Sequence, residues 1–200
     1  MHKIRMIFYL VGLTILSMGI SLTIKSDMGA GPWDALNVGL SNTIGLTVGS
    51  WVIIVGSILI IINGFLLKVR PDFLAILTIV LIGFIIDFWL IFVFAHLEPV
   101  GIVQKLIILV IGLIALAFGI ATYLQANYPL SPIDRFMMGI RYRLKVNLMV
   151  AKTLGELTAL VLAFIFKGPI GIGTIIVALM VGPFIQIFAP RLERLKAKMQ

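Results

Sequence analysis

The chain has 200 residues, of which 61% are hydrophobic and only 12% are charged, with a mean hydropathy of +1.18. So little polar surface could not cover a water-soluble globule of this length, which excludes an ordinary soluble domain and indicates an integral membrane protein. The net charge of +8 would raise nucleic-acid binding in a soluble protein. The absence of cysteine excludes disulfides, thiolate metal sites and thiol chemistry.

Residues 6–24 form the first uncharged apolar run, and they follow His2, Lys3 and Arg5. At about 1.5 Å per residue the run is long enough to cross a bilayer. It is too long for the core of an ordinary signal peptide, and no small-x-small cleavage site follows it. We therefore expect it to be retained as the first of six membrane-spanning helices.

Residues 31–34 read Gly-Pro-Trp-Asp and predict the start of a short helix. Proline lacks the N–H that the first helical position would leave unpaired, and Asp34 at the third position can accept free N–H groups. Apolar residues then recur at helical spacing, at Trp33, Leu36, Leu40 and Ile44. The segment is too short to span, so we expect it to lie along the interface or to enter the bilayer as a re-entrant helix.

Residues 45–67 and 73–95 predict the second and third spans. Asn63 lies in the second, where we expect it to make a hydrogen bond between helices. Asp87 lies toward the outer end of the third. Because a charge at depth is costly, Asp87 either reaches the headgroup level, next to Trp89, or handles an ion or a substrate.

Residues 106–124 predict the fourth span, and residues 131–134 then read Ser-Pro-Ile-Asp. Ser131 is a good N-cap before Pro132, and Asp134 takes the position that Asp34 has in the first half. Two interpretations of these carboxylates stay open. They cap their helices, or the two helix ends point at a shared central site from opposite leaflets.

Residues 148–166 predict the fifth span and contain Lys152 and Glu156 on one helix face, where an ion pair would neutralise both charges. A role for Glu156 in transport is the alternative. Residues 168–190 predict the sixth span, which "GPIGIGT" opens, and a basic tail, residues 191–200, follows. Gly171, Gly173 and Thr174 form either a turn with a cap or an anion-binding helix start.

Positive charge is divided unequally between the two sides of this six-span topology. With the N-terminus in the cytoplasm, thirteen of the sixteen Lys and Arg residues fall inside, and only Lys25, Lys105 and Lys167 fall outside. This bias follows the positive-inside rule and supports both termini being cytoplasmic. It also accounts for the net charge, which argues against nucleic acid as a partner.

The two halves of the chain repeat one another at an offset of one hundred residues. Pro32, Asp34 and Gly39 recur as Pro132, Asp134 and Gly139, within eight ungapped identities between positions 12 and 44. Three spans in each half reverse the orientation of the second copy. We therefore expect inverted repeats, residues 6–98 and 102–190, within a single membrane domain, residues 1–200.

The segments "MGAGPWDALNVGLSNTIGLTVG" and "GPIGIGTIIVALMVGPFIQIF" resemble the YczE/YyaS/YitT family of bacterial membrane proteins, closest to its YczE/YyaS branch. The markers are "PWD" followed by "GLS" and "GIGT" followed by "VGP", and the resemblance covers nearly the whole chain. The second copy departs from the pattern with "PID", and the first has "PDFLAILT" where the second has "GIGT". The resemblance implies a polytopic plasma-membrane protein, with some members linked to lipopeptide antibiotic production, and supplies no catalytic residues.

No catalytic motif is present, so we expect neither an enzyme nor a metal or cofactor site. Our leading hypothesis is an all-α, six-span plasma-membrane transporter of a small solute, coupled to protons or a cation, because buried carboxylates outnumber buried bases. The alternative is a non-transporting scaffold or accessory protein, for example in secondary-metabolite or lipopeptide production. Expected partners are the lipid bilayer, a small solute, and further copies of the chain or a membrane partner protein. The candidate substrate- or ion-binding residues are Trp33, Asp34, Asn63, Asp87, Asp134, Lys152, Glu156, Gly171, Gly173 and Thr174.

Overall fold

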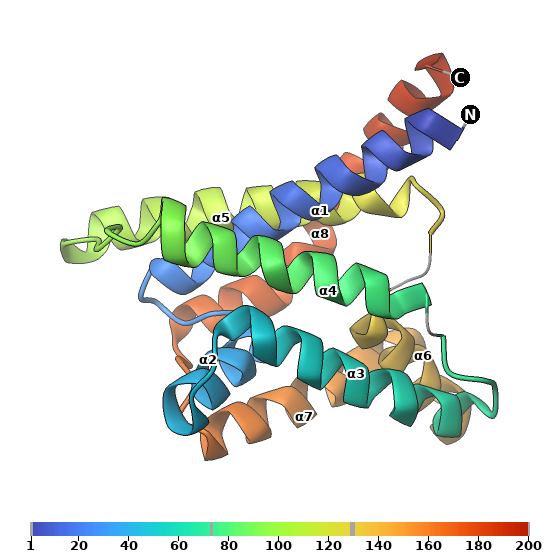
Figure 1. Cartoon of the computed structure of the whole chain (residues 1–200), viewed down its shortest axis with the longest axis horizontal. Helices are drawn as coiled ribbons and strands as arrows, with labels where there is room; N and C mark the ends of the chain where they lie inside the picture. The colour runs from blue at the N-terminus through green and yellow to red at the C-terminus, as the bar shows by residue number, and fades with distance from the viewer. Residues whose placement is uncertain (1, 73, 129–130, 200) are drawn as a thin grey trace. The chain divides into compact units, whose positions relative to one another are not determined.

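The computed structural model describes residues 2–72, 74–128 and 131–199, and the elements within these ranges are all helices (Figure 1). Six stretches of helix are long and apolar enough to cross a membrane, as predicted. Phe73, the predicted start of the third span, and Gln200 of the tail lie outside the described residues. The six are α1 (His2–Lys25), α3 (Val48–Leu67), α4 (Leu74–Asp87) with the π-helix η1 (Phe88–Val93), α5 (Gly101–Leu124), α7 (Leu148–Ile165) and α8 (Ile172–Met199).

Two shorter helices begin where the repeated Pro-x-Asp motif predicts them. They are α2 (Pro32–Ile44) and α6 (Pro132–Leu144), each of 13 residues with proline as its first residue. The proline ring fixes φ at a value that suits the first turn of a helix. Neither helix is long enough to be a candidate span.

The sixth predicted span differs from the observed helix at both ends. α8 begins at Ile172, because Pro169 and Gly171 belong to a loop whose backbone pairs with the loop after α1. At its other end the helix continues through Pro190 to Met199, so span and basic tail form one helix. Pro183 and Pro190 are accommodated within it, at the cost of a backbone hydrogen bond each.

The chain forms two compact units, and both halves of the sequence contribute to each unit. Unit 1 comprises Met1–Gly31, Ile85–Tyr128 and Pro169–Gln200, and therefore holds α1, η1, α5 and α8. Unit 2 comprises Pro32–Phe84 and Pro129–Gly168, and holds α2, α3, most of α4, α6 and α7. The predicted site residues are accordingly divided between two units.

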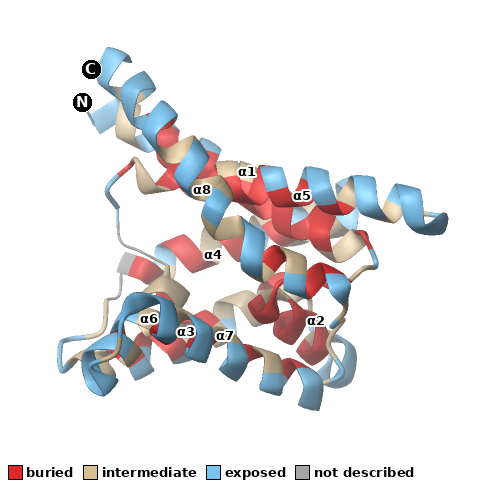
Figure 2. Ribbon diagram, turned by 180° about the vertical axis from the view of Figure 1, so that it is seen from behind, coloured by how far each residue is buried: buried red, intermediate tan, exposed pale blue. Residues whose placement is uncertain are grey.

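In unit 1 the core is a close antiparallel crossing of α1 and α5. A Cβ atom placed on Gly19 would lie 2.6 Å from the Cα of Leu116, and one on Gly119 would lie 2.6 Å from the Cα of Leu16. The helices therefore touch backbone to backbone, which only small residues allow. Figure 2 shows buried residues along both helices here. Leu13 of α1 is fully buried.

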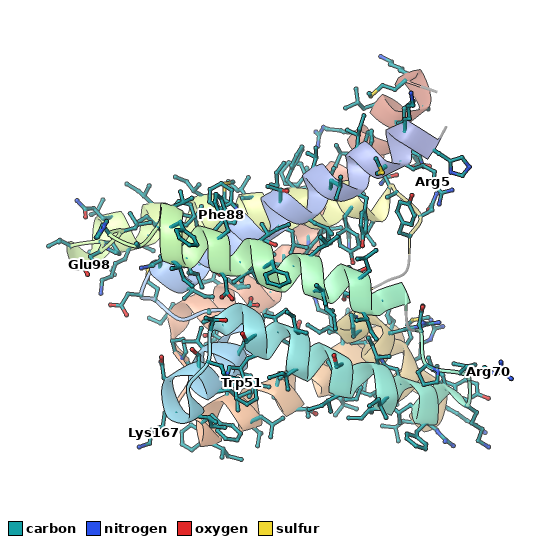
Figure 3. All side chains as sticks on the ribbon, in the orientation of Figure 1. Arg5, Trp51, Arg70, Phe88, Glu98 and Lys167 are labelled. Atoms are coloured by element: carbon teal, nitrogen blue, oxygen red, sulfur yellow. The ribbon has the colours of Figure 1, made fainter. Side chains whose placement is uncertain are left out.

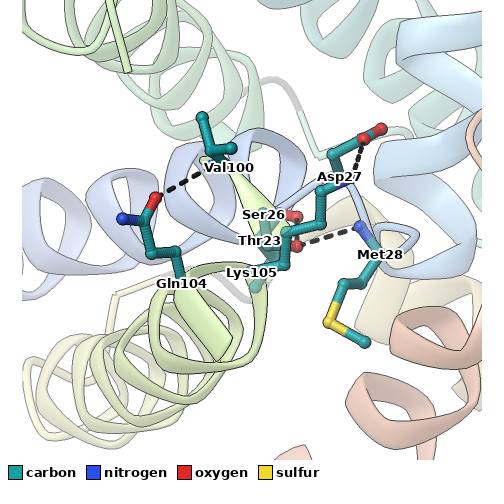
Figure 4. A network of polar contacts seen from close by, with 7 residues as sticks. All are labelled: Thr23, Ser26, Asp27, Met28, Val100, Gln104 and Lys105. Atoms are coloured by element: carbon teal, nitrogen blue, oxygen red, sulfur yellow. Dashed lines mark hydrogen bonds and ion pairs between the residues drawn. The ribbon is translucent and has the colours of Figure 1, made fainter. Parts of the chain in front are cut away.

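Polar contacts hold the loop after α1 near the start of α5 (Figure 4). Asp27 forms an ion pair with Lys105, and Ser26 Oγ donates to the carbonyl of Thr23 at 2.6 Å. The N–H of Met28 in turn donates to Ser26 Oγ at 3.4 Å. Because Asp27 is largely exposed, this pair contributes little stability, about 0–1 kcal/mol.

In unit 2 the two short helices pack against the spans of the other half: α2 against α7, and α3 against α6. Glycine again sets the distance, since a Cβ on Gly39 would lie 2.7 Å from the carbonyl oxygen of Phe166. From Pro32 to Leu40, α2 is buried at every position except Asp34, which is half-buried. The helix is thus surrounded by protein, a setting in which each of its polar atoms needs a partner.

Candidate functional site

One face of α2 carries three polar side chains. Trp33 and Asn37 lie four residues apart, and Asp34 lies three residues before Asn37, so all three share a side of the helix. Trp33 is 8% exposed and Asn37 is 4% exposed. We call this group the α2 polar face.

Two atoms of the α2 polar face are buried without a hydrogen-bond partner among the described residues, Trp33 Nε1 and Asn37 Oδ1. Buried polar atoms are nearly always paired, and leaving one unpaired costs about 1–3 kcal/mol. The first is a donor and the second an acceptor. Each atom could therefore take up one further hydrogen bond.

The indole of Trp33 is positioned by a neighbour from the second half of the chain. Its ring meets Phe136 of α6 edge to face, with centroids 5.9 Å apart and planes at 89°. This geometry is the favoured one for aromatic pairs and adds to the burial energy of both rings. The unpaired N–H is therefore carried by a ring that packing holds in place.

Asp34 completes the α2 polar face with a titratable group. Within the part of the chain that the structure describes, its carboxylate has no hydrogen bond and no ion pair. Burial raises the pKa of Asp34 from 3.8 to about 7, because removing water disfavours the charged form. Asp34 thus changes charge near neutral pH, on the same helix as a donor and an acceptor that have no partner among the described residues.

Asp134, the repeat counterpart of Asp34, is tied into a helix cap. Ser131 Oγ accepts from the N–H of Asp134 at 3.2 Å and donates to Asp134 Oδ2 at 2.8 Å. These bonds match the predicted N-cap at Ser131 and the capping interpretation of Asp134. The two aspartates therefore differ, since Asp34 is not held in this way.

We expect Ser131→Ala to destabilise the protein by about 1 kcal/mol, because the first turn of α6 loses its cap. The measurement is thermal unfolding of the detergent-solubilised protein. Ser57→Ala is the matched control, because Ser57 Oγ only bonds the Ile53 carbonyl of its own helix and should change stability little. Equal melting temperatures for Ser131→Ala and the wild type would show that the cap is unimportant.

Asn63 joins α3 to α6, as predicted for a helix-to-helix hydrogen bond. Its Nδ2 donates to the Pro132 carbonyl at 2.8 Å, while its Oδ1 is buried and unpaired among the described residues. It borders a small cleft that also includes Arg70 and the ion pair of Arg135 with Asp72. That ion pair escaped sequence reasoning, because its members are 63 residues apart and no pattern links them.

The remaining candidates of unit 2 lie on α7. Lys152 Nζ is 3.6 Å from Glu156 Oε1, so the predicted ion pair within one helix is present. The pair neutralises both charges locally, and this accounts for their presence without a transported ligand.

In unit 1 the predicted glycine residues form a turn with satisfied N–H groups. The N–H of Gly171 donates to Thr174 Oγ1 at 3.1 Å, and that of Gly173 donates to the Met28 carbonyl at 2.7 Å. An anion would need these same N–H groups, so the bonds favour the turn over an anion site. Asp87, at the junction of α4 and η1, also belongs to unit 1.

The structure thus places Trp33, Asp34, Asn63 and Asp134 in unit 2, and adds Asn37, which sequence reasoning missed. A signal for Asn37 was present in its helical spacing from Trp33 and Asp34. It was hidden because the residue one hundred positions later is Met137, so the repeat comparison does not pick it out.

A model of a family of unknown function, DUF6198, matches residues 3–190. Among curated relatives, the uncharacterized protein YyaS of Bacillus subtilis is 43% identical over 95% of this chain and 94% of its own length. The uncharacterized membrane protein YczE of the same organism is 34% identical over 94% of this chain and 86% of its own. An uncharacterized protein of Haemophilus influenzae is 27% identical over 93% of this chain and 84% of its own length. No solved structure matches the chain.

Proposed function

This multi-pass membrane protein belongs to the DUF6198 family and has YyaS and YczE among its relatives. On that premise we propose that it carries a small solute across the bacterial plasma membrane. In this proposal both termini are cytoplasmic, in keeping with the positive-inside rule. The observation that carries it is the α2 polar face, which combines a titratable carboxylate with a buried donor and a buried acceptor that have no partner among the described residues.

In a helix with only a structural role, the α2 polar face would lower the stability of the fold without any benefit. An apolar residue at position 37 would remove an unpaired buried acceptor and would raise stability, so its presence calls for a binding partner. A short, non-spanning helix that is buried in protein is also the kind of element that transporters use to line a site. The α2 polar face therefore supports solute binding better than it supports a scaffold.

Asp34 supplies the link to protons. With its pKa near 7, its carboxyl group gains or loses a proton within the physiological range. Solute bound to Trp33 Nε1 and Asn37 Oδ1 would experience a neutral acid in one state and a carboxylate in the other. Solute affinity and proton binding are then coupled, and the coupling is reciprocal.

Inverted repeats complete the proposal, and the glycine contacts between α1 and α5 support them. Gly19 of α1 contacts Leu116 of α5. Their counterparts one hundred positions away, Gly119 and Leu16, contact each other in the same way, as a twofold relation between the two halves requires. The helices of unit 2 show the same relation: α2 packs against α7, and their counterparts in the other half, α6 and α3, pack against each other. Inverted repeats of this kind underlie alternating access in many secondary transporters, with α2 and α6 here as the re-entrant helices.

The test is proton movement in proteoliposomes loaded with the pH dye pyranine. A panel of amino acids, monosaccharides and small quaternary ammonium ions is added outside, one at a time. We expect at least one of them to change the internal pH with wild-type protein. Asp34→Asn should abolish this change, because the amide cannot exchange a proton, and Asn37→Leu should weaken it at least tenfold if a hydrogen bond to the solute is worth about 1.4 kcal/mol.

The matched control is Glu98→Gln, which makes the same carboxylate-to-amide change at an exposed position in a loop (Figure 3). It should leave the internal pH change intact. A solute response that persists in Asp34→Asn would overturn the role of Asp34. The absence of any response from wild-type protein across the panel would count against transport.

A further inference from the structure

We propose that the end of unit 2 formed by the last turns of α3 and α6 binds the headgroups of anionic phospholipids. The surface consists of five exposed basic residues, which we call the basic end. Figure 3 shows one of them, Arg70, extending away from the ribbon. The five are Lys68, Arg70, Arg141, Arg143 and Lys145.

The fold gathers these residues from two segments about seventy positions apart. A Cβ on Gly139 of α6 would lie 3.0 Å from Cβ of Leu66 on α3. One turn later, Arg143 Nη2 donates to the carbonyl of Phe65 at 2.9 Å. The two helix ends are therefore in contact, and the positive charges within and just after these last turns share one surface.

Within the part of the chain that the structure describes, no carboxylate neutralises the charges of the basic end. Among the described residues, none of the five forms an ion pair. The carboxylates nearest to them along the chain are both engaged elsewhere, Asp72 with Arg135 and Asp134 with Ser131. An external anion is thus the available counter-charge, and uncompensated like charges favour its binding.

The helices on either side place the basic end at the boundary of the bilayer. Lys68 directly follows candidate span α3, and Lys145 comes three residues before candidate span α7. Large apolar side chains are exposed next to the charges, with Phe65 at 75% and Met149 at 79%. Apolar side chains in the acyl region and basic ones at phosphate level suit a lipid better than a free phosphate ion.

The net charge of the lipid decides which headgroup fits. A zwitterionic headgroup brings its own ammonium group to the phosphate, whereas phosphatidylglycerol leaves the phosphate uncompensated. Each Lys or Arg near an anionic surface adds about 1 kcal/mol, or roughly a factor of five in affinity. The basic end should therefore select phosphatidylglycerol over phosphatidylcholine.

The test is native mass spectrometry of the detergent-purified full chain with added phosphatidylglycerol or phosphatidylcholine. We expect wild-type protein to bind phosphatidylglycerol at least tenfold more tightly. In the triple variant Lys68→Gln, Arg141→Gln and Lys145→Gln this preference should fall about tenfold or more. The charge-preserving swap Lys68→Arg, Arg141→Lys and Lys145→Arg should retain it, and it also reports on correct folding.

Two further arms of the experiment ask whether the charge must lie at the basic end and whether the bound molecule must be a lipid. Neutralising Arg191, Arg194 and Lys198 to Gln removes the same charge from the end of α8, and should leave most of the preference in place. Millimolar inorganic phosphate should not displace the lipid. An equal loss from the α8 variant, full displacement by phosphate, or no preference in the wild type would each overturn the proposal.

Discussion

Gly19→Ala should lower the melting temperature of the solubilised protein by about 6–12 °C, equivalent to roughly 3 kcal/mol. The added Cβ would lie 2.6 Å from the Cα of Leu116, well inside van der Waals contact. The atoms it meets are backbone, so no side chain can rotate away, and α1 and α5 must separate. Separation would weaken van der Waals contact along the whole crossing, which supplies most of the core of unit 1.

Gly119→Ala should give a loss of similar size, because its Cβ would meet Leu16 in the same way. The double variant should lose less than the sum of the two, since one separation of the helices relieves both clashes.

The matched control is Gly155→Ala on α7, where the nearest atom would lie 3.4 Å from the new Cβ, an ordinary contact. There the better helix propensity of alanine should leave stability unchanged or raise it by up to about 1 kcal/mol. If Gly19→Ala and Gly155→Ala melt at the same temperature, the close crossing of α1 and α5 is not what stabilises unit 1.

The second large effect concerns the titration of Asp34. Trp51→Phe and Trp89→Phe leave Trp33 as the single tryptophan of the three in the chain. We expect the fluorescence of this variant to change with a midpoint near pH 7, because a carboxylate forms on the neighbouring residue as the pH rises. Adding Asp34→Asn should remove the transition completely, since an amide does not titrate, whereas adding Glu98→Gln should leave it in place.

The same shift in the pKa of Asp34 determines how the contribution of Asp34 to the free energy of unfolding depends on pH. Between about pH 4 and pH 7 the folded state keeps a proton on Asp34 that the unfolded state releases. The folded state binds more protons in this range, so the Asp34 contribution to stability falls as the pH rises. The melting temperature of Asp34→Asn relative to wild type should therefore increase from pH 4 to pH 7 and then level off. A flat difference across this range would show that the pKa of Asp34 is not raised.

The two tests separate the properties of the site from its use. A titration near pH 7 without solute-driven proton movement would leave Asp34 as an acid with a raised pKa and remove the support for coupled transport. Loss of both in Asp34→Asn would tie the raised pKa to the function.

Much of the fold follows from local pattern. The six spans depend on length and hydropathy alone, and so their ends were predictable to within five residues, apart from the C-terminal end of α8. The starts of α2 and α6 follow from proline at the first helical position, and the Lys152–Glu156 pair follows from a spacing of one helical turn. Each of these features depends on residues that are close in sequence.

The state of the polar groups was decided only by tertiary structure. Asp34 and Asp134 occupy the same place in the repeat, yet among the described residues the first has no partner, while the second is held by Ser131. The ion pair of Arg135 with Asp72 and the bond from Asn63 to Pro132 likewise join residues more than sixty positions apart. Burial and partnership depend on which helices pack together, and the local pattern that builds a helix carries no information about its neighbours. For this reason the sequence alone determined a six-span membrane protein, while the contrast between its two repeated aspartates emerged only in the folded chain.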